Sequence, residues 1–240
     1  MFDSVFSVSM LGRARAQGLL DIALTDIRSY SLSKHRNTDD YPFGGGAGMV
    51  MMAQPVMDAM AAAEKTHPSA RRIYLGPRGK RLTTDLARAL SAEPELILLC
   101  GHYEGVDQRA LDACVDEEIS IGDYILTGGE TAAIVLVDAV SRFIPGVLGC
   151  SESPEEESFS GSLLEYPQYT RPRNLKGMSV PDVLLNGDHA KIRKWRRRES
   201  LSATLRFRPD LLKNAPLTRE DLQMLDEIRE ELNDTCSSEN

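Results

Sequence analysis

Short apolar runs alternate with segments of helical periodicity between residues 72 and 142, and this alternation limits the fold more than any other feature of the chain. The run 95–100 (ELILLC) is nearly continuous, as is typical of a strand buried on both faces. Strands are also predicted at 18–26, 72–75 and 116–124. Helices are predicted at 52–64, 83–92, 106–114 and 131–142, the second with Thr83 or Thr84 as its N-cap. Strands that alternate with helices indicate an α/β domain with a largely parallel sheet.

Residues 150–162 (CSESPEEESFSGS) show no hydrophobic period and are rich in Ser and Glu, which indicates a linker between two domains. Beyond it, helices are predicted at 188–206 and 218–232. The latter begins with Thr218 and Asp221 in a spacing close to that of a capping box. We therefore expect a first domain of residues 1–150, a flexible linker of residues 151–164 and a small helical domain of residues 165–240.

A basic block stands out in a chain of net charge −8: residues 166–208 contain eleven Lys or Arg and three Asp or Glu, a net charge of +8. Such a block predicts a face that binds nucleic-acid phosphates, although a solvated helix face explains the charges equally well. Arg193, Lys194 and Arg197 fall on the helix face opposite Ile192 and Trp195, so they are the candidate phosphate ligands. Trp195 is expected to anchor the core of the small domain.

The cysteine and histidine patterns predict neither disulfides nor a metal site. The four cysteines show no CxxC spacing, and Cys100 and Cys114 lie in apolar surroundings typical of reduced core residues in a cytosolic protein. The four histidines are scattered singly, so no metal site is predicted. No apolar run approaches the roughly 18 residues that span a bilayer, and the N-terminus lacks the pattern of a signal peptide. We therefore expect a cytoplasmic protein.

Three glycine-bearing turns each follow a predicted strand, at 75–79, at 101–105 and at 121–124 continuing to 128–130. Ligands bind outside the carboxyl ends of strands in open α/β sheets, so we expect the turns to converge on a small-molecule site. Main-chain groups there could hold an adenine and a ribose, with Ile121 or Leu126 as an apolar wall. The glycine cluster 43–49 (FGGGAGM) matches neither a P-loop nor a dinucleotide fingerprint, and composition alone is equally compatible with a flexible loop.

Two segments carry acid groups that suit proton transfer. Glu157 follows Glu155 and Glu156 in the linker, and a carboxylate on a mobile segment can swing into a site as a base, although a solvated acidic loop is the more frequent case. Residues 165–172 (EYPQYTRP) combine Glu165, two aromatic rings and Arg171, which suit a flipped nucleobase. An ordinary turn-rich start of the second domain is again the simpler interpretation.

In this order, the segments resemble the bacterial tRNA (guanine-N1)-methyltransferase family of the SPOUT class. The resemblance covers nearly the whole chain, and several matching stretches exceed five residues. The stretches are 35–40 (HRNTDD), 43–49 (FGGGAGM), 101–107 (GHYEGVD), 120–124 (SIGDY), 141–149 (SRFIPGVLG), 157–159 (ESF), 166–172 (YPQYTRP) and 187–195 (GDHAKIRKW).

The resemblance implies a fold and a cofactor. The fold is a SPOUT-type, largely parallel sheet that is flanked by helices and tied in a trefoil knot, followed by the small helical domain and assembled as an obligate homodimer. The implied cofactor is S-adenosylmethionine, and the implied assistance by Mg²⁺ has no dedicated site in this sequence. The implied cofactor contacts are Tyr74, Leu75, Gly76, Pro77, Gly101, Ile121, Gly122, Asp123, Tyr124, Ile125 and Leu126. Gly128 and Gly129 would lie close by, and Glu104 would lie near the cofactor or the target base.

The resemblance also implies an activity, methylation of N1 of the tRNA guanosine 3′-adjacent to the anticodon. Glu157 takes the place of the family's general base and would act on cofactor held by the other subunit. Arg142 takes the place of the partner of that base. Glu165 and Arg171 are the remaining catalytic candidates, and Arg142, then Arg171, are the candidates to stabilise the charge on guanine O6.

The chain departs from the family pattern at two places. The family usually has Asp where Glu157 stands, and its members begin with a strand and turn ahead of the segment matching Met1 and Phe2, so we expect that first strand to be missing. Two other functions remain compatible with the sequence. One is a SPOUT enzyme that methylates another RNA target, and the other is an inactive RNA-binding module.

Overall fold

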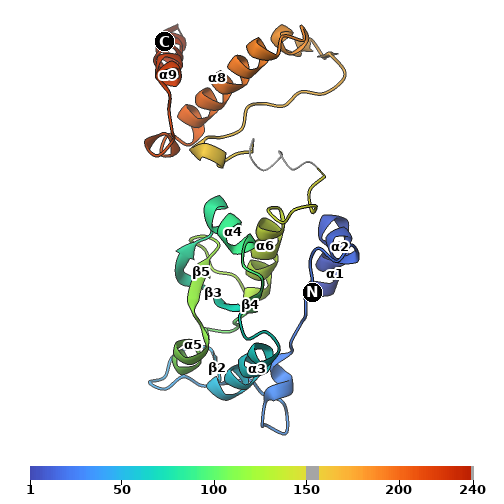
Figure 1. The fold of residues 1–240 in the computed structure, drawn as a ribbon. Coiled ribbons are helices and arrows are strands. Elements are labelled where there is room, and N and C mark those ends of the chain that lie inside the picture. The colour runs from blue at the N-terminus through green and yellow to red at the C-terminus, as the bar shows by residue number, and fades with distance from the viewer. Residues whose placement is uncertain (150–156, 239–240) are drawn as a thin grey trace. The chain divides into compact units, whose positions relative to one another are not determined.

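A parallel sheet of three strands lies at the centre of the N-terminal part of the chain (Figure 1). The structure, a computed structural model, describes residues 1–149 and 157–238. The predictions for Glu155, Glu156 and the first part of the linker fall outside these residues. By its internal contacts the chain divides into two compact units, Met1–Ser151 and Glu152–Asn240.

The sheet confirms the predicted α/β organisation. Its strands β3 (Arg71–Arg81), β4 (Leu96–Leu99) and β5 (Glu117–Ser120) lie in the order β4-β3-β5, and both pairings are parallel. Strand β4 is therefore an edge strand, which leaves all of its residues except Leu99 half-buried although full burial was expected. The predicted strand at 18–26 is wrong. Within the described residues no strand runs beside this segment to share main-chain hydrogen bonds with it.

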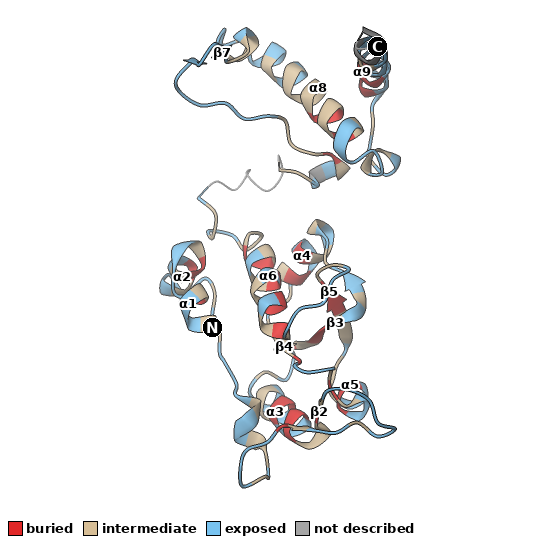
Figure 2. Ribbon diagram, turned by 180° about the vertical axis from the view of Figure 1, so that it is seen from behind, coloured by how far each residue is buried: buried red, intermediate tan, exposed pale blue. Residues whose placement is uncertain are grey.

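Helices cover both faces of the sheet, because successive residues of β3 point to opposite sides. Ile73 and Leu75 pack with α4 and α6, and Tyr74 packs with α3 and α5. The sequence predicts all four helices, which are α3 (Ala53–Thr66), α4 (Thr84–Ser91), α5 (Gln108–Cys114) and α6 (Gly129–Ser141). Buried residues, red in Figure 2, occur on the strands and on the helices that pack against them.

Strand β3 does not end at Gly76 and Pro77 as the sequence suggests. Leu75 and Lys80 both lie opposite Ile119 of β5, so residues 76–79 leave the ladder as a loop and pairing then resumes. Pro77 has no N–H to give to a ladder, which suits it to this excursion. The loop follows the buried residues 73–75 of β3, and ligands of α/β proteins bind at such carboxyl ends of strands.

The segment before the sheet is largely irregular. It contains α1 (Phe2–Phe6), α2 (Ser9–Ala16), the 3₁₀ turn η1 (Ile27–Tyr30) and the antiparallel pair β1 (Asp39–Asp40) and β2 (Val50–Met51). The glycine cluster 43–49 is thus the connection between two short paired strands. Among the described residues, no helix combines the length and the apolar character needed to cross a bilayer.

The second unit consists mainly of two helices, α8 (His189–Phe207) and α9 (Arg219–Ser238), as the sequence predicts. Leu201 of α8 and Leu225 and Ile228 of α9 are its most buried core residues. The second unit also contains a β-hairpin, and no sequence pattern indicated this hairpin. The remaining elements are η2 (Ser160–Ser162), β6 (Asn174–Leu175), β7 (Met178–Ser179), η3 (Asp182–Leu184) and η4 (Leu211–Lys213).

Candidate functional site

The structure places the three glycine-bearing turns at the carboxyl ends of the strands of one sheet and joins two of them directly. The N–H of Gly129 donates to the carbonyl oxygen of Gly101 over 2.7 Å, which joins the turn after β4 to the start of α6. A Cβ added at Gly101 would lie 2.9 Å from the Tyr74 hydroxyl, so the turn after β4 also rests on the end of the buried part of β3. A Cβ at Gly129 would lie 2.8 Å from Cys100 Cα, so this approach of main chain to main chain requires glycine.

His102 and Glu130 form a polar pair beside these glycines. Their Nε2 and Oε1 atoms are 2.6 Å apart, and a Cβ at Gly128 would lie 2.6 Å from Glu130 Oε2 and 2.8 Å from His102 Cε1. The pair therefore lies directly against the Gly128 backbone. No sequence pattern singled out either side chain, although Glu130 immediately follows the glycine pair.

Glu118 of β5 anchors the loop 76–79. Its carboxylate accepts the main-chain N–H of Arg78 over 3.0 Å and lies 3.2 Å from the Arg78 guanidinium. A side chain at Gly76 would collide with this carboxylate, and one at Gly79 would collide with the Glu118 backbone. No sequence pattern singled out Glu118, because it directly follows two other acids, Asp116 and Glu117.

The segment after β5, residues 124–126, carries an exposed apolar surface next to the glycine-bearing turns. Ile125 is 81% exposed, Tyr124 57% and Leu126 38%, although all three are apolar or aromatic. Asp123, in the same segment, forms an ion pair with Arg81 at the end of β3. Exposed apolar side chains next to polar main-chain groups are typical of a ligand-binding wall.

Two groups near the turns are buried, and this limits what they can do. Burial raises the pKa of the Tyr74 hydroxyl, with a further contribution from Glu118, and the ring belongs to the core. Tyr74 can therefore meet a ligand chiefly through its main chain. Burial also raises the pKa of the Cys100 thiol to about 12, so this cysteine is an unreactive thiol packed against the core, as expected.

The glycine cluster 43–49 and the turn 101–105 lie side by side. The Glu104 N–H donates to the Met49 carbonyl over 3.0 Å, and a Cβ at Gly48 would lie 2.5 Å from Glu104 Cγ. The Tyr103 hydroxyl donates to Asp39 over 3.1 Å. The cluster is therefore tied to the site by contacts that span more than fifty residues of sequence, which composition does not reveal.

The catalytic candidates lie on both units. Arg142 is a half-buried residue that caps the C-terminus of α6 in the first unit. Glu157, Glu165 and Arg171 belong to the second unit. Ser158 accepts the N–H of Glu165 over 3.0 Å, and Glu165 in turn accepts from the side-chain amide of Gln168 over 2.6 Å. These hydrogen bonds join Ser158, Glu165 and Gln168 within the second unit, and Glu157 directly precedes the first of these residues.

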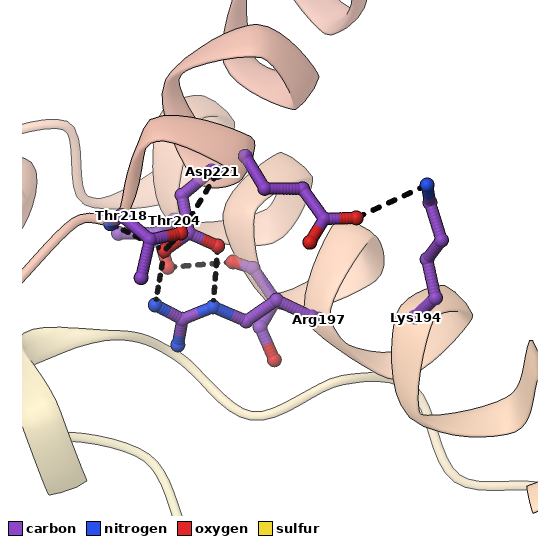
Figure 3. A network of polar contacts seen from close by, with 7 residues as sticks. Lys194, Arg197, Thr204, Thr218 and Asp221 are labelled. Carbon is purple, nitrogen blue, oxygen red and sulfur yellow. Dashed lines mark hydrogen bonds and ion pairs between the residues drawn. The ribbon is translucent and has the colours of Figure 1, made fainter. Parts of the chain in front are cut away.

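The basic helix is largely paired within its own unit (Figure 3). Arg197 donates two hydrogen bonds, of 2.8 and 2.9 Å, to the two carboxylate oxygens of Asp221 on α9, and Lys194 lies 3.1 Å from Glu220. Arg197 therefore faces α9, which differs from the phosphate-binding position expected for it. Arg193 is exposed and forms no ion pair with any described residue.

Asp221 is the centre of this network. The Arg197 guanidinium, together with the N–H and hydroxyl of Thr218, holds the pKa of its carboxyl well below the usual range. The Asp221 N–H donates to the Thr218 hydroxyl over 3.2 Å, which completes the capping box that the sequence predicts. Thr204 of α8 is fully buried nearby and accepts the N–H of Leu164 over 2.9 Å.

Trp195 lines a cavity of about 200 Å³ in the second unit instead of anchoring its core as predicted. The core between α8 and α9 consists of aliphatic side chains and leaves Trp195 half-buried. The cavity residues are Tyr166, Pro167, Gln168, Tyr169, Leu184, Ile192, Trp195 and Arg196, and we call this set the aromatic cavity. Among the residues that the structure describes, His, Cys, Asp and Glu form no group of three or more able to hold a metal ion.

Comparison with known proteins gives consistent matches. The family described as tRNA (Guanine-1)-methyltransferase TrmD matches residues 1–214. A relative from Limosilactobacillus fermentum is 53% identical over 236 residues, which is 97% of this chain and 93% of the relative. One from Caldicellulosiruptor saccharolyticus is 54% identical over 90% of this chain and 88% of its own length, and one from Moorella thermoacetica is 52% identical over 95% and 92%. All three are named tRNA (guanine-N(1)-)-methyltransferase.

Proposed function

This chain belongs to the tRNA (guanine-1)-methyltransferase family, and from that premise we propose that it methylates N1 of the tRNA guanosine 3′-adjacent to the anticodon, with S-adenosylmethionine as methyl donor. The observation that carries the proposal is the set of three glycine turns at the strand ends, two of them in direct contact, with an exposed apolar segment, in a chain more than half identical to its named relatives. A methyl group at this position supports maintenance of the reading frame, and the activity belongs in the cytoplasm with its tRNA substrate.

The residues of the first unit fit the proposed donor. S-adenosylmethionine supplies an electrophilic methyl group, and its adenine and ribose need main-chain partners and an apolar wall. Gly101, Gly128 and Gly129 offer a main chain that a side chain would obstruct, and Ile125 and Leu126 offer exposed apolar surface. The other residues proposed to hold it are Tyr74, Leu75, Gly76, Pro77, Glu104, Ile121, Gly122, Asp123 and Tyr124.

The proposed proton acceptor is Glu157. Guanine N1 carries a proton at neutral pH and must lose it before N1 can attack a methyl group, and a carboxylate within hydrogen-bond reach can take it. As the proton leaves, negative charge grows on O6, and a guanidinium stabilises that charge. Arg142 is the first candidate for this role and Arg171 the second, with Glu165 as the alternative carboxylate.

The general base Glu157 and the turns that hold the methyl donor are proposed to come from different subunits of a homodimer. Glu157 lies in the second unit and the glycine turns lie in the first, so one chain need not supply both to the same site. A trefoil knot in the first unit, the remaining part of the proposed architecture, would hold the three turns close together.

Methyl transfer to tRNA transcripts that differ only in the nucleotide 3′ of the anticodon tests this function. Guanosine at that position should be methylated at N1, and adenosine there should abolish the product. Equal methylation of both transcripts would place the target elsewhere in the RNA, and methylation of a ribose hydroxyl would indicate a different reaction.

Gly128→Ala is expected to weaken binding of S-adenosylmethionine by about tenfold, equivalent to roughly 1.4 kcal/mol. The new methyl group would meet the Glu130 carboxylate and the His102 ring, which are ends of side chains that can move without unfolding the domain. Titration calorimetry measures the change. Gly149→Ala is the matched control, because nothing lies within 4 Å of a Cβ there. Unchanged affinity in a folded Gly128→Ala protein would contradict the site.

Arg193→Ala is expected to weaken the salt dependence of tRNA binding. The plot of log affinity against log salt concentration has a negative slope, and its magnitude should decrease by about 0.9, the contribution of one phosphate contact. Arg193 is exposed on the basic helix and is not neutralised by a described acid. Filter binding at several salt concentrations measures the slope. Arg229→Ala removes an exposed arginine of α9 that lies 2.9 Å from Asp226, and it should leave the slope unchanged. Equal slopes for wild type and Arg193→Ala would exclude this contact.

A further inference from the structure

The aromatic cavity of the second unit has no part in the proposed proton transfer, and we propose that it binds one unpaired nucleobase of the tRNA other than the guanine that is methylated. This inference rests on the proposed function, because it takes tRNA as the substrate. It adds to that function a second base-binding site in the second unit.

The walls of the aromatic cavity include several planar groups. The rings of Tyr169 and Trp195 have centroids 6.3 Å apart, and their planes are inclined at 52° to each other. The Arg196 guanidinium lies 4.6 Å from the centroid of the Tyr166 ring and forms another planar surface. The volume of about 200 Å³ is below the roughly 300 Å³ at which pockets for drug-sized ligands begin. The cavity therefore fits a single ring system.

The chemistry of the lining suits a nucleobase. Unstacked RNA bases bind to proteins by stacking on aromatic rings and guanidinium planes, with hydrogen bonds to their edges. Gln168 lines the cavity and supplies such a hydrogen-bonding group. Its amide nitrogen donates to Glu165, and its side-chain carbonyl oxygen can accept a hydrogen bond from the edge of a base. Ile192 and Leu184 complete the lining with apolar surface.

Charge next to the cavity favours RNA over a peptide as its occupant. Arg171 lies two residues after the lining residue Tyr169, is exposed and forms no ion pair with a described residue. Arg193 is likewise exposed without an ion pair to a described residue, and it lies on the face of α8 opposite Trp195, where it can meet a neighbouring phosphate of the same strand. A nucleobase arrives with phosphates on each side, and exposed guanidinium groups match those phosphates. An aromatic peptide side chain brings no such anions.

The same lining argues against the methylated guanine as the occupant. None of the described residues that line the cavity carries a carboxylate, and the proposed proton acceptor Glu157 is not among them. Glu165, the alternative acceptor, lies beside the cavity but already accepts a hydrogen bond from the lining residue Gln168. The glycine turns proposed to hold the methyl donor all belong to the first unit, whereas every lining residue belongs to the second.

Trp195 is the only tryptophan of the chain, so its fluorescence reports directly on the aromatic cavity. We expect unmodified tRNA transcript, added to the full-length protein, to quench this emission. Transcripts that each lack one base of the anticodon loop should then reveal one position, different from the methylated guanosine, at which loss of the base removes the quenching. Loss of that base should also weaken binding by about 5- to 100-fold, the range for one stacked base.

Tyr169→Leu removes part of the stacking wall and keeps the tryptophan. It should weaken binding of intact tRNA by a similar factor and should make binding insensitive to loss of that one base. Phe207→Leu is the control, because Phe207 is an exposed aromatic residue of α8, the helix that carries Trp195, and does not line the aromatic cavity. It should leave both the quenching and the base dependence as in the wild type.

Three results would overturn the proposal. The first is tRNA binding, measured by filter retention, without any change in Trp195 emission. The second is quenching that depends on the methylated guanosine itself. The third is that Tyr169→Leu weakens binding of every transcript that lacks one base by the same factor as it weakens binding of intact tRNA. Methyl transfer to intact tRNA is measured in parallel. Its absence in the wild type would refute the proposed function. Normal transfer together with any of these three results would refute the second base-binding site alone.

Discussion

Replacement of Glu157 by Gln is expected to lower single-turnover methyl transfer by about 10²–10⁴-fold, the usual contribution of a positioned general base. Gln keeps the size of Glu and much of its hydrogen bonding, but it cannot accept the N1 proton. Affinity for S-adenosylmethionine should change little, because the turns proposed to hold it lie in the other unit of the chain. Rapid-quench assays with enzyme in excess over tRNA measure the rate.

Glu165→Gln is the comparison that separates the two described carboxylates. Glu165 already accepts a hydrogen bond from Gln168, and its own N–H is bound by Ser158, so it is held within the second unit. Its Gln variant should be far milder than Glu157→Gln, as should those of Glu155 and Glu156. A near-normal rate for Glu157→Gln would end its assignment as the base.

A heterodimer tests whether base and donor come from different subunits. One chain carries Glu157→Gln, and the other carries Gly101→Trp, which fills the turn proposed to hold the donor. If the two groups come from different subunits, one site holds both lesions and the other holds neither, so about half of the activity per dimer should return. If both groups come from the same subunit, each site carries one lesion, and no activity should return.

Arg197→Met is expected to cost the second unit about 3 kcal/mol of unfolding free energy, at the lower end for loss of one partner of a buried ion pair. Asp221 is only 4% exposed, so without the guanidinium its charge stays buried with Thr218 as its remaining partner. The lower end applies because the Arg197 side chain is 38% exposed and water screens part of the interaction. Urea unfolding followed by Trp195 fluorescence reports on this unit specifically.

Two further variants separate burial from charge. Lys194→Ala removes the neighbouring pair with Glu220, in which both side chains are more than 60% exposed, and it should change stability by less than about 1 kcal/mol. The double variant Arg197→Met, Asp221→Asn should recover much of the loss, because no unpaired charge remains buried. Equal effects of Lys194→Ala and Arg197→Met would contradict the special role of the Asp221 network.

The same network predicts how the second unit responds to acid. Because the pKa of Asp221 is lower in the folded protein than in the unfolded chain, its ionisation stabilises the fold above the unfolded value of about 3.9. That contribution should fall progressively as the pH drops below about 4. In Arg197→Met the pKa should move back towards its usual value, so stability should depend less on pH in this range.

The sequence by itself determined the elements whose signals are local. Apolar runs located strands β3 and β4, and helical periodicity located six helices, because both patterns follow from the geometry of one segment. The N-cap Thr83 and the capping box of Thr218 and Asp221 are equally local, since each hydrogen bond closes within three residues. The expected ligand site at the strand ends also follows from the order of the elements alone.

The tertiary structure decided which partners these elements have. Residues 18–26 have strand-like composition but no neighbouring strand among the described residues, and a strand exists only when another shares its hydrogen bonds. Helical phase put Arg197 opposite Trp195, yet only the packing of α8 against α9 shows that Asp221, 24 residues away, takes up its charge. Trp195 likewise borders a cavity because aliphatic residues of both helices already fill the core. Contacts between distant segments depend on how whole elements pack, and no local pattern encodes them.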